Sequence, residues 1–304
     1  MKHNTKITAI LITMFIVTQL IGLFVVASYV DGITLPYGME PPEDINENTS
    51  IISILFAFAI AITIFILLTK FKAETFIRLW FYVVTVIAIG LALNVFLFKL
   101  NFFYASSFVA LLLALPLAYY KIFQRNLWVH NITELLIYPG IAAVFVPILN
   151  LMGVTILLLL ISLYDIWAVW HSEFMQKMAK YQIENLKFFT GFFVPYADKK
   201  QKQKIKLLRQ KYANKPMLLE KNFRKAKIKI HLAILGGGDI IFPIITAGVF
   251  YKTYMSIIPA LIITASATIA LLFLFILARK GKFYPAMPFL TIGMYLGMIV
   301  CWLI

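Results

Sequence analysis

The chain has 304 residues, of which 62% are hydrophobic and 13% are charged, and its net charge is +15. Soluble proteins carry about 45–50% apolar and about 25% charged residues, so these values exclude a water-soluble domain and require lipid around part of the surface. The same composition excludes a disordered chain and a collagen-like fibre, and a single Cys excludes a disulfide scaffold.

Nine apolar stretches are long enough to cross a membrane as helices, since about 20 residues span about 30 Å of hydrocarbon. The first has 24 residues, more than the roughly 7–15 of a signal-peptide core, so we interpret it as a helix. We therefore predict an all-α membrane protein with nine transmembrane helices. In chain order, the stretches cover residues 7–30, 51–69, 79–98, 102–120, 131–149, 151–170, 231–250, 255–278 and 283–303.

Charge predicts the orientation, because Lys and Arg collect in short cytoplasmic loops. Segment 31–50 has five acidic residues and no Lys or Arg, whereas segment 171–230 has sixteen basic and four acidic residues. The alternation predicts a cytoplasmic N-terminus and an outside C-terminus in a multi-pass protein of the cell membrane. We divide the chain into a six-helix part (1–172), a basic cytoplasmic loop (173–230) and a three-helix part (231–304).

The basic loop also bears on partners. It contributes +12 of the net charge of +15, so we assign most of the basicity to membrane topology and to anionic lipid headgroups. Nucleic acid as a partner would require a recognisable binding module, and the sequence has none. The expected partners are therefore the lipid bilayer and other membrane proteins, and not nucleic acid.

Ionisable groups inside the hydrocarbon cost about 2.5–3.5 kcal/mol each on insertion scales, so each calls for a reason. Ten of the thirteen acidic residues lie outside the predicted helices. Glu134 lies about one turn inside the fifth stretch, where we expect it to reach the cytoplasmic interface. Asp165 and Asp239 remain, and a rise of about 1.5 Å per residue places them about 9 and 12 Å below the cytoplasmic surface. Two carboxylates that meet share a proton and can activate water for peptide hydrolysis.

Features of the neighbouring sequence point the same way. A glycine run, Gly236, Gly237 and Gly238, precedes Asp239, and such a run lets another backbone approach and lets a helix loosen. Tyr164 precedes Asp165, and its phenol can bind a carboxylate or a substrate, although an isolated Tyr more often serves packing.

A third feature lies near the start of the last stretch. The segment Pro285-Ala286-Met287-Pro288 resists helix formation and indicates a non-helical edge about one turn below the cytoplasmic surface.

Together these motifs resemble the presenilin and signal-peptide-peptidase proteases. That family has Tyr-Asp in the sixth of nine helices, Gly-x-Gly-Asp in the seventh and Pro-Ala-Leu at the ninth. This chain has Tyr164-Asp165, Gly236-Gly237-Gly238-Asp239 and Pro285-Ala286-Met287, so Met287 replaces the usual Leu with a residue of similar volume. The resemblance covers essentially the whole chain, and the small size and short ends are most similar to archaeal presenilin homologues.

The resemblance implies an intramembrane aspartyl endopeptidase that hydrolyses peptide bonds within transmembrane helices of substrate proteins. Asp165 and Asp239 would be catalytic, with neither a metal nor an organic cofactor. The implied substrate-binding residues are Tyr164, Gly236, Gly237, Gly238, Pro285, Ala286 and Met287.

Other intramembrane protease chemistries find no support in the sequence. A zinc protease would need His-Glu-x-x-His, which is absent. The histidines are predicted at membrane boundaries, so neither a metal cluster nor a serine–histidine pair is expected within the bilayer. They are His3, His130, His171 and His231.

Segment 186–195 in the basic loop is rich in strand-forming aromatic residues. It fits a hydrophobic anchor at the membrane interface. It also fits a strand edge that pairs with an unwound substrate, aided by the edge at Pro285.

Two alternatives to a protease remain open at this point. Intramembrane acids also serve proton- or cation-coupled transporters and channels, and a protein of this fold could bind helices without cleaving them. The absence of an internal repeat weighs against transport. The sequence leaves open the substrates, the cleavage position, accessory subunits and a homo-oligomer.

Overall fold

The structure is a computed structural model that describes most of the chain. The described residues are 5–39, 47–71, 73–101, 105–124, 126–171, 181, 190–197, 199–211, 231–278 and 284–304. Much of the predicted loop 173–230 therefore lies outside the described residues, as does residue 283, the predicted start of the last helix.

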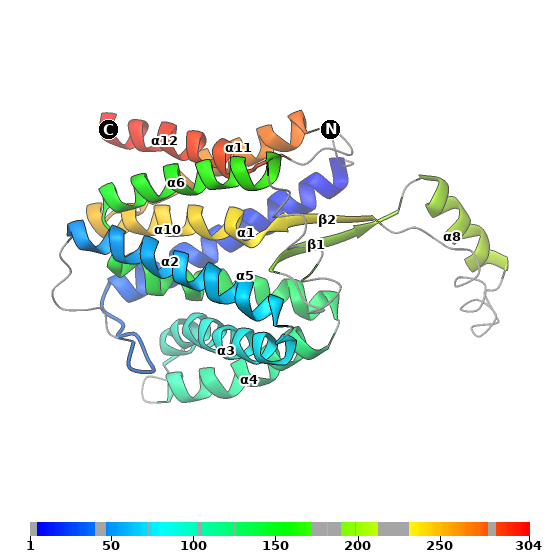
Figure 1. Cartoon of the computed structure of the whole chain (residues 1–304), viewed down its shortest axis with the longest axis horizontal. Coiled ribbons are helices and arrows are strands. Elements are labelled where there is room, and N and C mark those ends of the chain that lie inside the picture. Colours follow the sequence, from blue (N-terminus) through cyan, green and yellow to red (C-terminus); the bar gives the residue numbers. More distant parts are fainter. Residues whose placement is uncertain are drawn as a thin grey trace.

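Nine long apolar helices, which follow the order of the nine predicted stretches, make up most of the described chain (Figure 1). Among the residues that the structure describes, six spans are long and apolar enough to cross a membrane: α1, α3, α4, α5 with the short helix η1, α6 and α11. The nine helices are α1 (Thr5–Val30), α2 (Glu47–Lys70), α3 (Glu74–Lys99), α4 (Ser106–Phe123), α5 (Leu127–Phe145), α6 (Leu151–Trp170), α10 (Gly237–Tyr254), α11 (Ile257–Leu277) and α12 (Met287–Leu303), and η1 covers Val146–Ile148.

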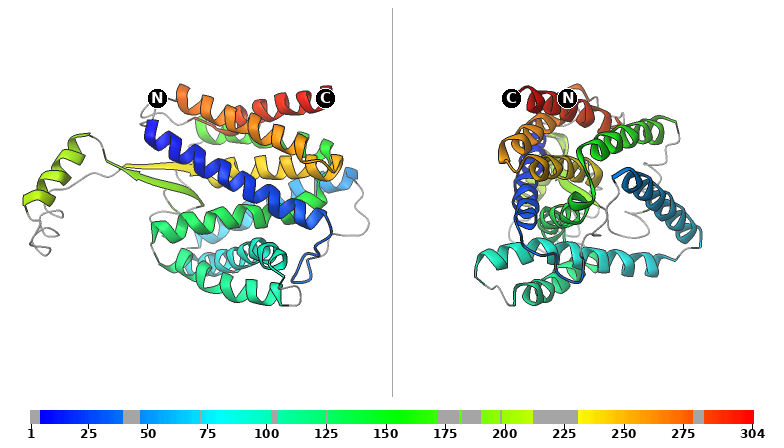
Figure 2. Two further views of the ribbon diagram at one scale, coloured as in Figure 1. Left: turned by 180° about the vertical axis from the view of Figure 1, so that it is seen from behind. Right: turned by 90° about the vertical axis from the view of Figure 1, so that its left-hand side faces the viewer.

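Helix α10 forms the centre of the bundle and contacts α1, α5, α6, α11 and α12 (Figure 2). Its buried side chains include Ile240, Ile244 and Val249. A helix that is apolar on every side is stable only when other elements surround it. The peripheral helices instead expose large apolar side chains, among them Trp80 and Ile292, as expected of a surface covered by lipid.

One end of the bundle is tied together by polar contacts. The Tyr251 hydroxyl donates to the Asp31 carboxylate (2.8 Å), and the Lys252 ammonium donates to the carbonyls of Pro147 (3.0 Å) and Leu149 (2.9 Å). These contacts bring together the C-terminal ends of α1, α5 with η1, and α10. The three helices therefore run in the same direction, and the first turn of α10 lies at the opposite end.

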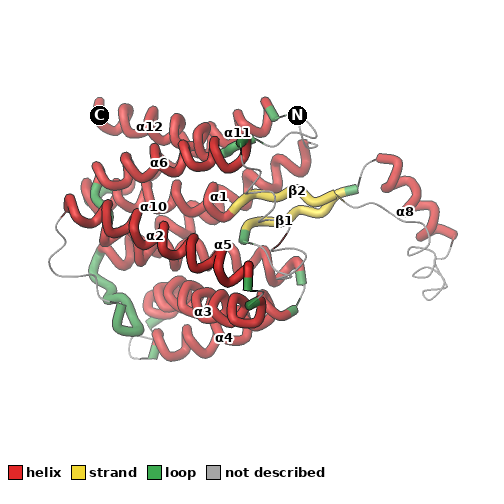
Figure 3. The backbone as a smooth tube through the Cα atoms, viewed as in Figure 1, coloured by secondary structure: helices red, strands yellow, loops and turns green. Residues whose placement is uncertain are grey.

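The prediction of an uninterrupted helix over 231–250 is wrong at its start. Residues His231–Gly236 form strand β2, which pairs antiparallel with β1 (Gly191–Tyr196) and leads directly into α10 (Figure 3). The fold is therefore mostly helical rather than all-α. The depth of Asp239 estimated from a helical rise no longer applies, because a strand rises about 3.3 Å per residue.

The two-stranded sheet has one buried and one exposed face. Phe192, Ala233 and Leu235 are buried against the helices, whereas Leu232 and Ile234 are exposed. Directly opposite residues of an antiparallel pair share a face, and Phe192 pairs with Leu235 as Phe193 pairs with Ile234. A small basic helix, α8 (Lys199–Lys211), follows β1.

Candidate active site

Asp165 projects from α6 into the bundle, where its side chain is 6% exposed. Its Oδ2 accepts a hydrogen bond from the backbone N–H of Met287 (3.1 Å), the first residue of α12. The Asp165 carboxyl is therefore hydrogen-bonded to the main chain of the Pro-Ala-Met segment rather than to one of its side chains.

Further polar contacts hold α6 and α12 antiparallel below that bond. The hydroxyls of Ser162 and Thr291 are 2.6 Å apart, and the Tyr295 hydroxyl donates to the Thr155 carbonyl (2.7 Å). Because these contacts follow one another along both helices, they set the position of the Met287 N–H relative to Asp165.

Asp239 lies in the first turn of α10, where a carboxylate interacts favourably with the helix dipole. Its carboxyl group is directed back toward the end of β2: a Cβ added at Gly236 would lie 3.2 Å from its Oδ2. The next residue, Ile240, is held by α1, since the buried side chain of Gln19 donates to its carbonyl (2.9 Å). Pro243 has no N–H and cannot close the helical bond to the Asp239 carbonyl.

The structure brings the two acids into one site. The carboxyl groups of Asp165 and Asp239 are close enough to repel each other when both are ionised. Asp239 lies at the end of the bundle where the sheet emerges, since β2 leads directly into α10.

The three glycines before Asp239 have different surroundings. A Cβ at Gly237 would lie 2.8 Å from the Tyr138 hydroxyl oxygen, so close packing against α5 requires a glycine there. Gly238 has more room, because the nearest atom, on Phe242, would be 3.9 Å away. Only part of the run is therefore demanded by packing.

The Pro-Ala-Met segment and Tyr164 also differ in placement. Pro285 is buried and, with Ala286, precedes α12 next to Asp165, whereas Met287 and Pro288 belong to the first turn of α12. The expectation of a non-helical segment over 285–288 is therefore wrong for its second half. The Met287 side chain is packed in the core. Tyr164 is 38% exposed and contacts the ring of Trp167, with ring centroids 6.3 Å apart, and so it is accessible from outside the bundle.

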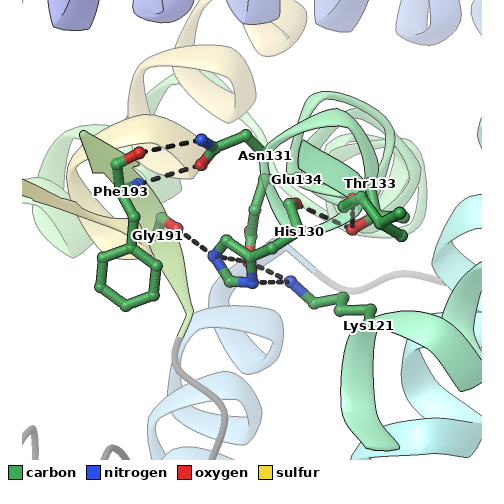
Figure 4. A network of polar contacts seen from close by, with 8 residues as sticks. Lys121, His130, Asn131, Thr133, Glu134, Gly191 and Phe193 are labelled. Atoms are coloured by element: carbon green, nitrogen blue, oxygen red, sulfur yellow. Dashed lines mark hydrogen bonds and ion pairs between the residues drawn. The ribbon is translucent and has the colours of Figure 1, made fainter. Parts of the chain in front are cut away.

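Residues of α5 next to β1 were not recognised as part of the site from the sequence. His130 and Glu134 were expected near the membrane interface, and their exposed fractions of 7% and 1% show that both are buried inside the protein. Glu134 pairs with Lys121 of α4, and Lys121 also contacts His130 (Figure 4). The available signal was the spacing of His130 and Glu134, which places both on one helix face, beside a Lys at the end of the preceding helix.

Comparison with known proteins now identifies the fold. Residues 12–304 match the family described as signal-peptide peptidase, presenilin aspartyl protease. The chain belongs to this family of aspartyl proteases. No curated protein matches the sequence significantly. The family assignment confirms the resemblance drawn from the three motifs and the enzyme class that it implied, and it makes the chain a membrane-embedded, multi-pass protein.

Two solved structures have the same fold. Each is the structure of a presenilin family intramembrane aspartate protease, one in space group C222 and the other in P2. The first is 19% identical, with a TM-score of 0.60, and the match covers 96% of this chain and 97% of that chain. The second is also 19% identical, with a TM-score of 0.57 and 95% of each chain covered.

Proposed function

We propose that this member of the presenilin family hydrolyses peptide bonds within the transmembrane helices of other membrane proteins, using Asp165 and Asp239. The proposal is supported by the electrostatic interaction between these two carboxyl groups, from α6 and α10, and by the hydrogen bond of Asp165 to the start of α12. The family assignment favours hydrolysis over a proton- or cation-coupled transporter or channel.

The chemistry requires one ionised and one protonated carboxyl group. The ionised group takes a proton from water as the water oxygen bonds to the scissile carbonyl carbon, and the protonated group donates to the carbonyl oxygen. When the tetrahedral intermediate collapses, a proton passes to the amide nitrogen and the C–N bond breaks. The products are a new carboxyl group and a new amine, and no metal or organic cofactor takes part.

A substrate helix must unwind locally before its peptide bond can reach the acids, and β2 offers an unwound segment a partner. Hydrogen-bonding groups alternate in direction along a strand. Helix α5 binds the backbone groups of Gly191 and Phe193 on the side of β1 away from β2. The backbone N–H and C=O groups of Phe192 and Val194 therefore point to β2. On β2, the backbone N–H and C=O groups of Leu232 and Ile234 therefore point away from β1. We call this side of the strand the open edge of β2.

This places the substrate differently from the expectation for segment 186–195. Residues 186–189 lie outside the described residues, and 191–195 belong to β1, whose two edges are bound by β2 and by α5. We therefore infer that the substrate strand adds to the open edge of β2, since no other described strand pairs with it. Strand addition of this kind uses main-chain hydrogen bonds and tolerates many sequences.

We further propose nine transmembrane helices, with the N-terminus cytoplasmic and the C-terminus outside the cell membrane. The parallel direction of α1, α5 and α10 supports this, because the charge alternation assigns all three the same direction. The site then faces the cytoplasm, and Tyr164, Gly236–Gly238 and Pro285–Met287 border the path of the substrate.

The proposal is tested by incubating purified protein in lipid vesicles with a synthetic transmembrane peptide, beside Asp239→Ala. Peptide fragments with the wild type and none with the variant support it. The same vesicles report proton leakage with an internal pH dye. Intact peptide together with leakage abolished by Asp239→Ala would establish the transport alternative.

A further inference from the structure

Helix α5 binds the edge of β1 that faces away from β2, and it does so mainly through one side chain. The Asn131 Nδ2 donates to the carbonyl of Phe193 (2.8 Å), and the N–H of Phe193 donates to the Asn131 Oδ1 (3.0 Å) (Figure 4). The side-chain amide thus takes the place that a peptide group of a third strand would occupy. Such a two-bond contact is specific for one residue of β1.

His130, the preceding residue of α5, binds β1 at a second point. Its Nε2 is 2.7 Å from the carbonyl oxygen of Gly191. A carbonyl only accepts hydrogen bonds, so Nε2 carries a proton, and Nδ1 of a neutral ring then accepts from Lys121 (3.4 Å). The imidazole also stacks on the ring of Phe193, with centroids 4.9 Å apart.

The charges behind His130 are buried and paired. Lys121 binds Glu134, and the exposed fractions of their side chains are 2% and 1%. A buried ion pair is poor evidence for stability, because apolar residues of similar size often do as well. In this site Lys121 contacts Nδ1 of the imidazole and the Glu134 Oε1 lies 3.6 Å from Nε2, so the pair contacts the same ring that binds β1.

The hydrogen bonds from α5 to β1 affect the start of α10 through the register of the sheet. Phe193 pairs with Ile234 and Gly191 pairs with Gly236, which is three residues before Asp239. A shift of β1 by one residue would turn its side chains to the opposite face and move its groups by about 3.3 Å. That distance is the length of one residue of a substrate strand.

We propose that Asn131 is a positioning residue which, with His130, holds β1 in a single register and thereby decides which substrate peptide bond reaches the two aspartates. The inference rests on the proposed function, and it adds a determinant of cleavage position that lies on α5, away from the acids. The sheet is formed before a substrate arrives, so the open edge of β2 keeps a constant offset from Asp239.

The test compares Asn131→Leu, which is similar in size and removes both bonds, with Asn126→Leu on the same helix. Asn126 caps the start of α5 by accepting from the N–H groups of Trp128 and Val129, so its loss weakens α5 without touching β1. Asn131→Asp, which keeps the acceptor for the Phe193 N–H and loses the donor, serves as a milder variant if Asn131→Leu folds poorly.

Two quantities are measured for each variant in vesicles: the masses of the products from one transmembrane peptide, and amide hydrogen exchange over 191–196 and 231–236. Exchange is also measured in an Asp239→Asn background. This comparison tests the hydrogen bonds from Asn131 to β1 even if the wild type does not cleave the peptide. Absence of cleavage by the wild type would count against the proposed function, and unchanged exchange against the role of Asn131.

In Asn131→Leu we expect roughly tenfold faster exchange at the Phe193 amide, because the loss of one net hydrogen bond changes an equilibrium by about that factor. We also expect a spread of cuts to bonds on either side of the main wild-type cut, and an increase in KM larger than the decrease in kcat. Asn126→Leu should keep the wild-type cut. Faster exchange with an unshifted cut, or the same spread of cuts in Asn126→Leu, would overturn the proposal.

Discussion

The two aspartates are held in different ways. Asp165 is anchored from outside its helix, by the N–H of Met287. Asp239 lies within the first turn of α10, after Gly236, which ends β2, and after two glycines that begin α10. A carboxylate that already accepts a main-chain bond keeps a constant orientation. The Asp239 carboxyl lies beside Gly236, at the junction of β2 and α10.

The first prediction concerns those glycines. Gly237→Ala should lower the free energy of unfolding by about 1–3 kcal/mol, the usual cost of overpacking, because the new methyl group meets the Tyr138 hydroxyl at 2.8 Å. Gly238→Ala should be nearly neutral, since its surroundings are open. Thermal unfolding in detergent measures both. Adding Tyr138→Phe should recover part of the loss in Gly237→Ala; no recovery would show that the hydroxyl is not the obstacle.

The second prediction concerns the Pro-Ala-Met segment. Met287 acts on Asp165 through its backbone N–H while its side chain packs in the core, so Met287→Leu should keep activity within about threefold. Pro285→Ala should lower kcat, because it removes the residue that keeps the start of α12 from extending. Steady-state cleavage rates measure both variants. Normal cleavage by Pro285→Ala with an inactive Met287→Leu would reverse this assignment.

At the scale of elements, the interruption of the predicted seventh helix is the main difference between expectation and structure. Residues 231–236 are as apolar as the helix that follows, and a short apolar run does not reveal whether it is a strand or a helix. Its partner β1 is about 40 residues earlier in the chain, across the basic loop. The aromatic content of 186–195 did indicate a strand, but its partner was not apparent.

The site itself was accessible from the sequence to the extent that isolated charges in apolar helices are rare. Elimination singled out Asp165 and Asp239 because every other acid except Glu134 lay outside the predicted helices. The same argument dismissed Glu134, because burial in a bundle depends on how α4 and α5 pack. Its partner Lys121 follows the predicted stretch 102–120 directly and lies in the last turn of α4. The bonds from Asn131 to β1 depend on tertiary packing that no local pattern encodes.

The third prediction tests the open edge of β2. Proline is tolerated at a strand edge whose N–H has no partner strand, so Ile234→Pro should leave the β1–β2 pairing intact while removing one donor to the substrate. We expect a decrease in kcat/KM of about tenfold or more, with unchanged exchange protection of β1. Ile234→Val is the matched control and should cleave normally. Wild-type cleavage by Ile234→Pro would show that the substrate does not add to this edge.

At the scale of the whole molecule, the direction of the bundle determines which substrates fit. A strand that adds to an edge has a fixed polarity, so an enzyme with a cytoplasmic site accepts helices of one orientation. The contacts of Tyr251 and Lys252 tie together the end of the bundle away from the acids. Under the proposed function, an unwound substrate enters at the other end, where the sheet lies.

The fourth prediction follows from this direction. Substrates with their N-terminus outside should be cleaved in the cytoplasmic half of the membrane, and Gly or Pro near the cut should speed cleavage by easing unwinding. Mass spectrometry of products from two model helices of opposite orientation, in vesicles of known enzyme orientation, measures this. Equal cleavage of both helices would refute the proposed topology.

The most direct test of the account is the activity of Asp165→Asn and Asp239→Asn, each made alone. In the proposed mechanism the two carboxyl groups have different tasks in water activation, so neither replaces the other. The measurement is cleavage of one transmembrane peptide in vesicles, with circular dichroism and thermal unfolding as proof of folding. We predict that each folded variant retains less than about a tenth of wild-type activity, and activity above that level in either one would contradict a mechanism that depends on both acids.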